Sequence, residues 1–172
     1  FNLTEGVRGP ARAALYPALF ADLRVPCTGS DAYTLGLTVD KAMTKLVARE
    51  NGVPVPQGIV VTAATLATVR WDALRYPVIL KPTYEDYSRG ILQSSVCRAS
   101  VEVQERVRAL LQEFESLVIE EFVYGSDVVV AFREGAGDGV LLPCEVVYPD
   151  ESGIKHRDLV KGNGSGLELR CP

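Results

Sequence analysis

The chain has 172 residues, of which 47% are hydrophobic and 23% charged, a composition typical of a globular protein with one domain or a domain and part of a second. The formal net charge is -4 and the basic residues are dispersed, which argues against a nucleic-acid partner. No apolar run is long enough to cross a bilayer, so we expect no membrane partner.

The first two thirds of the chain alternate between helical and strand patterns. Apolar residues at helical spacing predict a helix over 10–23, bent or delayed by Pro17, and another over 38–51 with Thr38 as its N-cap. A third helix is expected over 65–74. The strands of this part are predicted at 58–62 and, as a pair joined by a loop, at 76–81 and 91–97.

The last third of the chain is mostly strand. The switch from alternation to strand predicts an α+β (α/β) subdomain followed by the opening of a second sheet. The segment 134–139 is expected to be a turn, and GNGSG a loop between the last two strands. The predicted elements are a helix over 100–114 capped by Ser100 and strands over 116–122, 126–133, 139–148, 154–159 and 167–170.

Four cysteines are scattered along the chain, at Cys27, Cys97, Cys144 and Cys171. No two have the spacing of metal ligands, and the single histidine, His156, has no obvious partner, so we expect no zinc site. Scattered cysteines in a chain of this size do not predict a disulfide framework. We therefore expect reduced thiols and a cytoplasmic protein.

Lysines occur at two places where a phosphate would suit them. Lys41 and Lys45 share one helix face, where like charges repel unless an anion is near, although a solvated face is the commoner explanation. Lys81 ends an apolar strand and precedes a polar loop. Its stem either covers the core beside water, or its charge points into a phosphate site. In the second case Ser88 donates a hydrogen bond and Gly90 permits close backbone approach.

A second polar cluster follows the strand over 116–122. Two carboxylates at a strand end, Glu120 and Glu121, are either a solubilised sheet edge or a hinge whose backbone groups contact an adenine edge. In the second interpretation Phe122 and Val123 supply apolar surface, and Asp127 accepts the ribose hydroxyls.

The order of these signals resembles the ATP-grasp ligases, and specifically the D-alanine–D-alanine ligase group. The resemblance implies an incomplete ATP-grasp fold, with two small sheet-containing subdomains and the nucleotide between them. It divides the chain into the end of a substrate-binding region with linking helices (1–51), a lid subdomain (52–123) and the start of the central subdomain (124–172). The matching stretches are FNLTEG (1–6), VPCTGSDAYTLGLTVDKAMTK (25–45), GVPVP (52–56), YPVILKPTYEDYSRGI (76–91), VIEEFVYGSDVVVAF (118–132) and LPCEVVYP (142–149).

The resemblance also implies roles at the phosphates of ATP. Lys41 and Lys81 would contact them, and the loop Glu85–Gly90 would be their flexible cover. Lys161, which is otherwise an ordinary loop lysine, would reach the terminal phosphate, and Ser88 and Lys161 would act in the catalytic step. Positioned charges of this kind do most of the work in phosphoryl transfer.

At the other end of the nucleotide, Glu120, Glu121 and Val123 would hold the adenine, with Phe122 in the apolar wall and Asp127 on the ribose. The implied activity joins a carboxylate to an amine through an acyl phosphate, as in peptidoglycan precursor synthesis. Its partners would be ATP and D-alanine or a similar amino acid, and a homodimer is compatible with the resemblance. Magnesium is expected as well, with ligands outside this chain.

Two features depart from the pattern. Asp86 and Tyr87 stand where many such ligases have glycine and serine, which leaves open a ligase for another amino acid or peptide. The chain starts at Phe1 and ends in a pattern typical of a strand entering a turn, so we expect a piece of a ligase, inactive alone. A non-catalytic nucleotide-binding module is the remaining alternative.

Overall fold

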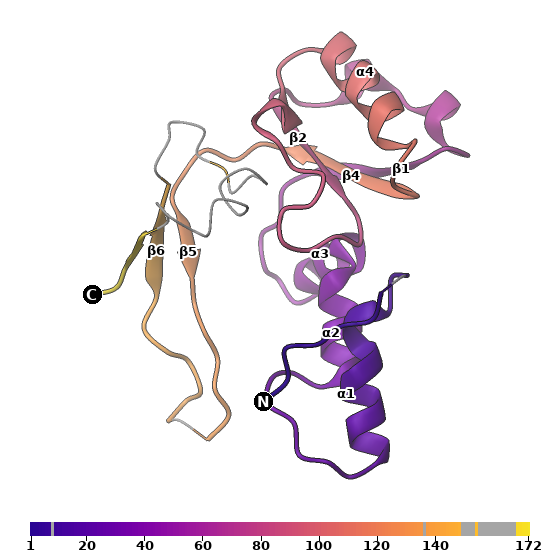
Figure 1. Ribbon diagram of the computed structural model, residues 1–172. Coiled ribbons are helices and arrows are strands. Elements are labelled where there is room, and N and C mark those ends of the chain that lie inside the picture. Colours follow the sequence, from indigo (N-terminus) through magenta and orange to yellow (C-terminus); the bar gives the residue numbers. More distant parts are fainter. Residues whose placement is uncertain (8, 136, 149–153, 155–167) are drawn as a thin grey trace.

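The computed structural model of the protein describes residues 1–7, 9–135, 137–148, 154 and 168–172. Lys161 and all but the first residue of the predicted strand 154–159 lie outside these ranges. Figure 1 shows three parts in chain order: a group of helices, a sheet covered by a fourth helix, and a second sheet at the side.

Three helices come first, α1 (Arg12–Asp22), α2 (Ala32–Val39) and α3 (Lys41–Glu50). The predicted first helix is confirmed, with Pro17 buried inside it. The helix α2 was missed because Gly36 weakens its pattern. It is started by Asp31, whose carboxylate accepts a hydrogen bond of 2.7 Å from the N–H of Thr34.

The predicted N-cap of the next helix, Thr38, is wrong. Asp40 caps α3 instead, accepting hydrogen bonds of 3.0 Å from the N–H groups of Ala42 and Met43. Thr38 belongs to α2, and its hydroxyl donates to the carbonyl of Thr34. The chain therefore turns at a single residue, so that α3 begins at Lys41.

The first sheet has the order β1 (Gly58–Thr62), β4 (Ser116–Glu121), β2 (Val78–Pro82) and β3 (Val96–Cys97), and all its pairs are antiparallel. The strands predicted for it are confirmed, and β2 and β3 pair as expected. The last strand is shorter than predicted because the 3-10 turn η3 (Gln93–Ser95) precedes it.

One face of this sheet is covered by α4 (Ser100–Leu110), drawn above the strands in Figure 1. The predicted helix is confirmed, although it ends before Phe114, and Ser100 is its first residue and not its cap. Successive strand residues point to opposite faces. The buried core between the sheet and α4 consists of Val61, Val78, Leu80, Cys97, Val103, Val107, Phe114, Leu117 and Ile119.

The helix predicted over 65–74 is wrong. Two 3-10 turns replace it, η1 (Leu66–Thr68) and η2 (Trp71–Ala73). The β-branched residues Thr68 and Val69 disfavour an α-helix, and Val69 is extended. The hydroxyls of Thr62 and Thr65 bond to each other's backbone N–H groups, which favours a turn.

The second sheet has the order β5 (Asp127–Val129), β6 (Cys144–Val147) and β7 (Glu168–Arg170). All three strands lie within predicted strands but are shorter. The register sets Glu145 against Arg170, so Cys144 and Cys171 stand opposite each other and form a disulfide. The expectation of reduced thiols is therefore wrong for this pair, because strand pairing and not sequence spacing brings it together. Among the described residues, no helix combines the length and apolar character needed to cross a membrane.

Candidate functional site

The face of the first sheet turned away from α4 carries a buried carboxylate between two lysines. Ile79 and Lys81 alternate with the core residues of β2, and Glu120 lies opposite Ile79 on β4. Lys81 Nζ donates a 2.8 Å hydrogen bond to one oxygen of Glu120, and Lys45 Nζ from α3 donates to the other. One interpretation of the sequence placed an anion near Lys41 and Lys45. The carboxylate of Glu120 supplies one for Lys45, so part of that negative charge belongs to the protein itself.

The charges of this trio are strongly coupled. The Glu120 residue is only 7% exposed, and burial raises the pKa of its carboxyl group. The neighbouring ammonium groups of Lys81 and Lys45 lower that pKa by more, so it lies below its ordinary value. Glu120 is therefore an ionised group that fixes Lys81 at the end of its strand and leaves the trio with one net positive charge.

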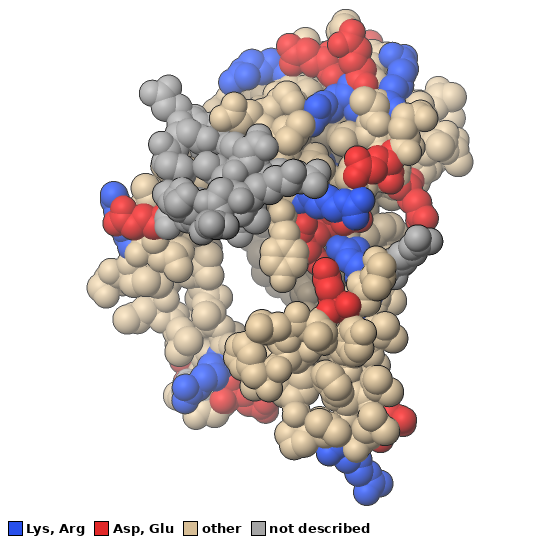
Figure 2. Space-filling model, in the orientation of Figure 1, with Lys and Arg blue, Asp and Glu red and all other residues tan. Residues whose placement is uncertain are grey.

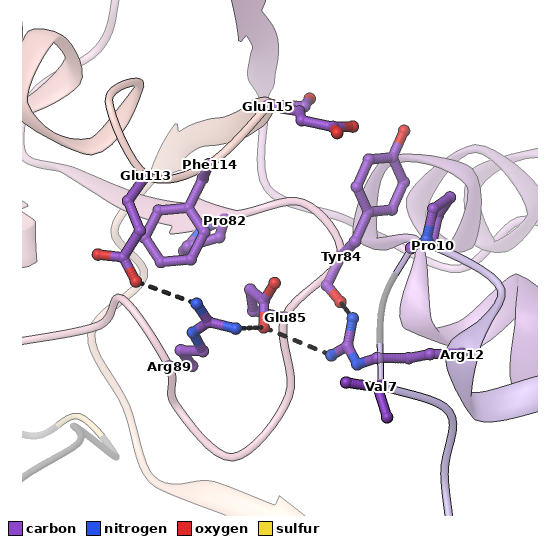
Figure 3. Close-up of a pocket in the computed structure, with 12 residues that line it drawn as sticks. Val7, Pro10, Arg12, Pro82, Tyr84, Glu85, Arg89, Glu113, Phe114 and Glu115 are labelled. Atoms are coloured by element: carbon purple, nitrogen blue, oxygen red, sulfur yellow. Dashed lines mark hydrogen bonds and ion pairs between the residues drawn. The ribbon is translucent and has the colours of Figure 1, made fainter.

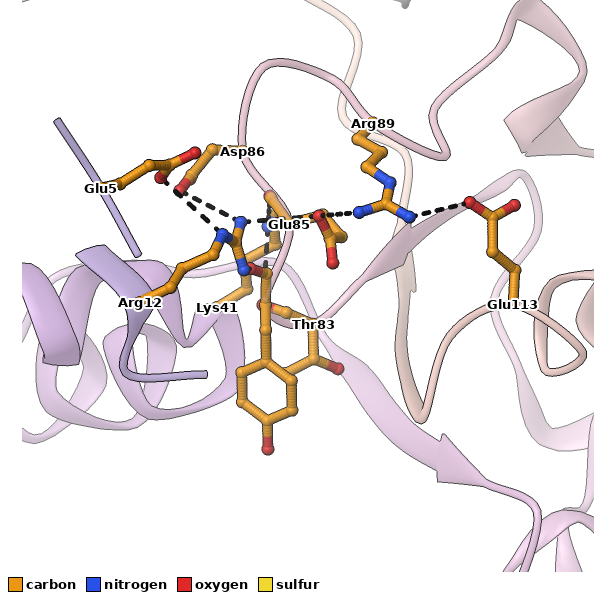
Figure 4. Close-up of polar contacts among 9 residues, drawn as sticks. Glu5, Arg12, Lys41, Thr83, Glu85, Asp86, Arg89 and Glu113 are labelled. Carbon is orange, nitrogen blue, oxygen red and sulfur yellow. Dashed lines mark hydrogen bonds and ion pairs between the residues drawn. The ribbon is translucent and has the colours of Figure 1, made fainter. Parts of the chain in front are cut away.

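Lys41, the first residue of α3, is hydrogen-bonded to the first residues of the loop that follows β2. Its backbone N–H donates to the carbonyl of Thr83 at 3.2 Å, and its ammonium group donates to the carbonyl of Glu85 and, at 3.5 Å, to that of Thr83. Burial lowers the pKa of Lys41, while the nearby carboxylate of Asp86 raises it. Figure 4 shows Lys41 beneath this loop.

At the end of β4, one backbone N–H group has no hydrogen-bond acceptor among the described residues. The N–H of Glu121 donates to Gln57, and that of Phe122 donates to Pro77. The next N–H, that of Val123, donates to no other described residue, and the Val123 side chain is exposed. A planar ligand with a hydrogen-bond acceptor on its edge would satisfy it beside the ring of Phe122.

A cavity of about 410 Å³ collects most of the predicted residues. It lies where β2, β4, the start of α3 and the start of β5 meet. Figure 2 shows basic and acidic side chains side by side where the first sheet meets the helices. The described lining residues are Lys41, Pro56, Ile79, Lys81, Ser88, Ile91, Glu120, Glu121, Phe122, Val123, Gly125, Asp127 and Ile154.

Of the predicted site residues that the structure describes, two do not line this cavity. Glu85 turns to arginines on the other side of the loop. Gly90 has a left-handed backbone, with φ of 78°, and a Cβ there would lie 2.5 Å from Pro82 and 3.0 Å from Phe114. Glycine is thus required at this position for packing and conformation. At the far end of the cavity, Asp127 accepts a hydrogen bond from the hydroxyl of Tyr148, and burial raises the pKa of that tyrosine.

A second cavity, of about 700 Å³, adjoins the first. Lys41, Ser88 and Ile91 line both, so they stand at the junction. Asp86 and Tyr87 of the loop also line the second cavity. This arrangement would place a ligand in the first cavity next to a ligand in the second, so that a chemical group is transferred from one to the other beside Lys41.

Two site residues were missed by the sequence prediction. Lys45 was noted as a helical lysine, but its bond to Glu120 depends on the position of α3 over the sheet. Arg12 binds the loop after β2 and belongs to none of the predicted motifs. A signal existed, because a cation in the first turn of a helix opposes the helix dipole unless acidic partners compensate it. No cluster of three or more His, Cys, Asp or Glu side chains able to hold a metal occurs in the described ranges.

Comparison with known proteins identifies the relatives of the chain. It is 35% identical over 136 residues to the D-alanine–D-alanine ligase of Coprothermobacter proteolyticus, a match that covers 77% of this chain and 44% of the relative. It is 34% identical over 132 residues to the uncharacterized protein y4sG of Sinorhizobium fredii, covering 76% of this chain and 38% of that protein. The chain thus spans about two fifths of the length of these curated relatives. No family model matches the chain.

Solved structures give the same result for the fold. The D-alanine–D-alanine ligase of Bacillus anthracis, solved in complex with ATP, superposes with a TM-score of 0.67 at 20% identity, over 79% of this chain and 44% of that one. The D-alanyl-alanine synthetase A of Vibrio cholerae superposes with a TM-score of 0.70 at 13% identity, over 96% and 50%. The chain is similar to the D-alanine–D-alanine ligases in sequence and in fold.

The predicted resemblance and fold class are therefore confirmed: the described residues form part of an ATP-grasp fold. The Vibrio cholerae match covers nearly the whole chain, so the likeness extends beyond the first sheet and its helix.

Proposed function

We propose that the protein carrying this chain is an ATP-dependent ligase that joins a carboxylate to an amine through an acyl phosphate, most specifically a D-alanine–D-alanine ligase of peptidoglycan precursor synthesis. The observation that carries the proposal is the cavity on which Lys41, Lys81, Val123 and Asp127 converge from four separate segments. The similarity to ligases of this name and the ATP in the Bacillus anthracis structure support it.

In this proposal the nucleotide lies along the cavity. The open N–H of Val123 meets the adenine edge, Phe122 and Ile79 provide apolar surface, and Asp127 accepts the ribose hydroxyls. The phosphates lie at the other end, near Lys41 and Lys81. Glu120 holds the ammonium group of Lys81 in place, so that little side-chain entropy is lost when the phosphates bind.

The carboxylate substrate would lie in the second cavity and meet the terminal phosphate at the junction near Lys41 and Ser88. Its oxygen attacks the terminal phosphorus, ADP leaves, and the acyl phosphate is formed. An amine then attacks the acyl carbon and inorganic phosphate leaves. Fixed ammonium groups lower the barrier because they stabilise the charge on the transferred group without having to reorganise. Lys161 is proposed to contact the terminal phosphate.

We also propose the division into segments 1–51, 52–123 and 124–172 for the parts of the enzyme, and a cytoplasmic location, where ATP is available. Magnesium would accompany ATP in such an enzyme. The described residues provide no ligand set that fits it, so we assign no step to the metal from this chain. A ligase for another amino acid is the second candidate, favoured by Asp86 and Tyr87 in the wall of the second cavity.

The proposal is tested on the full-length protein by measuring phosphate release with ATP and a panel of D- and L-amino acids, together with ATP binding by calorimetry. Replacing Lys81 with Ala should weaken ATP binding about 10- to 100-fold, because a charge-assisted contact to phosphate is worth about 1.5–3 kcal/mol. The matched control is Glu134→Ala, on an exposed turn away from the cavity, which should leave affinity unchanged. Unchanged ATP affinity in Lys81→Ala would refute the assigned phosphate role.

A further inference from the structure

The loop after β2 is held to the start of α1 by one buried arginine. The side chain of Arg12 is only 10% exposed. Its Nη1 donates a 2.7 Å hydrogen bond to the carbonyl of Tyr84. Its Nη2 lies 3.5 Å from a carboxylate oxygen of Glu85 and 3.6 Å from one of Asp86. A single planar guanidinium group therefore contacts three consecutive loop residues. Figure 3 labels Tyr84, and Figure 4 shows the contacts to Glu85 and Asp86.

A second arginine, Arg89, contacts the loop residue Glu85 from the side opposite Arg12. Arg89 Nη1 lies 3.4 Å from the same Glu85 oxygen, and Nη2 lies 3.1 Å from Glu113. Its guanidinium also stacks over the ring of Phe114 at 5.4 Å. Figure 3 shows Glu85 between the two arginines. Glu85 is therefore bound to α1 on one side and, through Arg89, to Glu113 and Phe114, which follow α4, on the other.

Close packing contributes little beside these polar contacts. Residues of both the loop and the start of α1, among them Arg12, Tyr84 and Glu85, line a cavity of about 280 Å³. The backbone of the loop is also strained, because Tyr87 and Ser88 adopt left-handed φ angles of 50° and 56°. Polar contacts must therefore offset this strain for the loop to keep its shape.

The same loop segment holds Lys41. The carbonyls that receive the Lys41 ammonium group are those of Thr83 and Glu85, next to the carbonyl of Tyr84 that Arg12 binds. Releasing the loop from Arg12 would move the acceptors of Lys41, and with them the lysine at the junction of the two cavities.

We propose that Arg12 is a positioning residue that holds the loop Tyr84–Ser88 in the conformation described above and thereby sets the position of Lys41. The part concerning the ligand rests on the proposed nucleotide function, whereas the clamp on the loop does not. Arg12 lines neither cavity of the proposed reaction, so it acts through its neighbours. These are the loop and Glu5, a residue of the second cavity whose carboxylate lies 3.7 Å from Arg12 Nε.

The test uses full-length Arg12→Ala and Arg12→Lys variants. Hydrogen exchange without nucleotide is followed at the amides of Arg89 and Ile91, which donate to Asp86 and Ser88 within the loop. Both variants should exchange about tenfold faster there, because lysine cannot reach the carbonyl and both carboxylates together, while amides of the first sheet keep their rates. ATP affinity should weaken by up to about tenfold, in proportion to the fraction of molecules in which the loop has left this conformation.

The matched control is Arg108→Ala, an exposed arginine on α4, which should change neither readout. Unchanged exchange at Arg89 and Ile91 would overturn the clamp. Faster exchange spread equally over the first sheet would also overturn it, because Arg12 would then support the fold in general. Faster loop exchange with unchanged ATP affinity would overturn the link to Lys41. Absence of ATP binding in the unmodified protein would instead refute the proposed function and leave the exchange result as the test of the clamp.

Discussion

Replacing Glu120 with Gln removes the charge that joins Lys45 to Lys81. Removing one partner of a fully buried ion pair costs about 3–5 kcal/mol, and exposed pairs contribute about 1 kcal/mol or less. Glu120 is buried, but the side chains of Lys45 and Lys81 are 22% and 28% exposed and regain some hydration. We therefore expect the free energy of unfolding at pH 7 to fall by about 1–3 kcal/mol.

The pH dependence of this loss has a definite sign. The pKa of Glu120 is lower in the folded state than its ordinary value of 4.5. Its charged form therefore stabilises the fold fully above that value, and the contribution disappears as pH falls through the lower folded-state pKa. The difference in stability between the unmodified protein and Glu120→Gln should shrink correspondingly on acidification. Urea unfolding from pH 7 down to pH 3 measures this difference.

Glu121→Gln is the matched control, since it makes the same change one residue later. Glu121 pairs with Arg75, which is 82% exposed, at 3.5 Å, so the loss should stay below about 0.5 kcal/mol. Equal losses for the two variants at pH 7, or a Glu120 loss that does not change with pH, would refute the assignment of Glu120 as the ionised centre of the lysine pair.

Two further substitutions, each with a control substitution, test the local structure by urea unfolding. Gly90→Ala should cost about 2–4 kcal/mol, because its Cβ would meet Pro82 at 2.5 Å in a left-handed backbone, whereas Gly52→Ala, with φ of 76° and open space, should cost only about 1 kcal/mol; similar losses would contradict the packing argument. Asp40→Ala should cost about 1 kcal/mol through loss of the α3 cap, and Thr38→Ala about 0.5 kcal/mol or less. A larger loss at Thr38 would restore it as the cap.

Much of the first sheet could be predicted from the sequence. The alternation of Val78 and Leu80 with Ile79 and Lys81 indicates a strand with one face in the core and a lysine on the other. The same alternation puts Glu120 on the lysine face, so the strand ends that line the cavity were identifiable before their neighbours were known. Local patterns suffice here because side-chain direction in a strand depends only on position parity.

Capping and turn residues were less predictable. The predicted cap of α3 is wrong because Thr38 and Asp40 both favour a helix start, and only the path of the chain shows which of them precedes N–H groups that need an acceptor. The structure has 3-10 turns in place of the helix predicted over 65–74. These turns likewise depend on reciprocal hydrogen bonds between the backbone N–H groups and hydroxyls of Thr62 and Thr65.

The charge contacts were decided by the tertiary structure alone. Glu120 meets Lys81 across 39 residues and Lys45 across 75, and Arg12 meets Glu85 across 73. The pairing of Cys144 with Cys171 follows from strand register in the same way. Periodicity in the sequence determines which face a side chain occupies, because that depends on local geometry. Which charges meet on that face depends on how distant segments pack, and only the tertiary structure determines that packing.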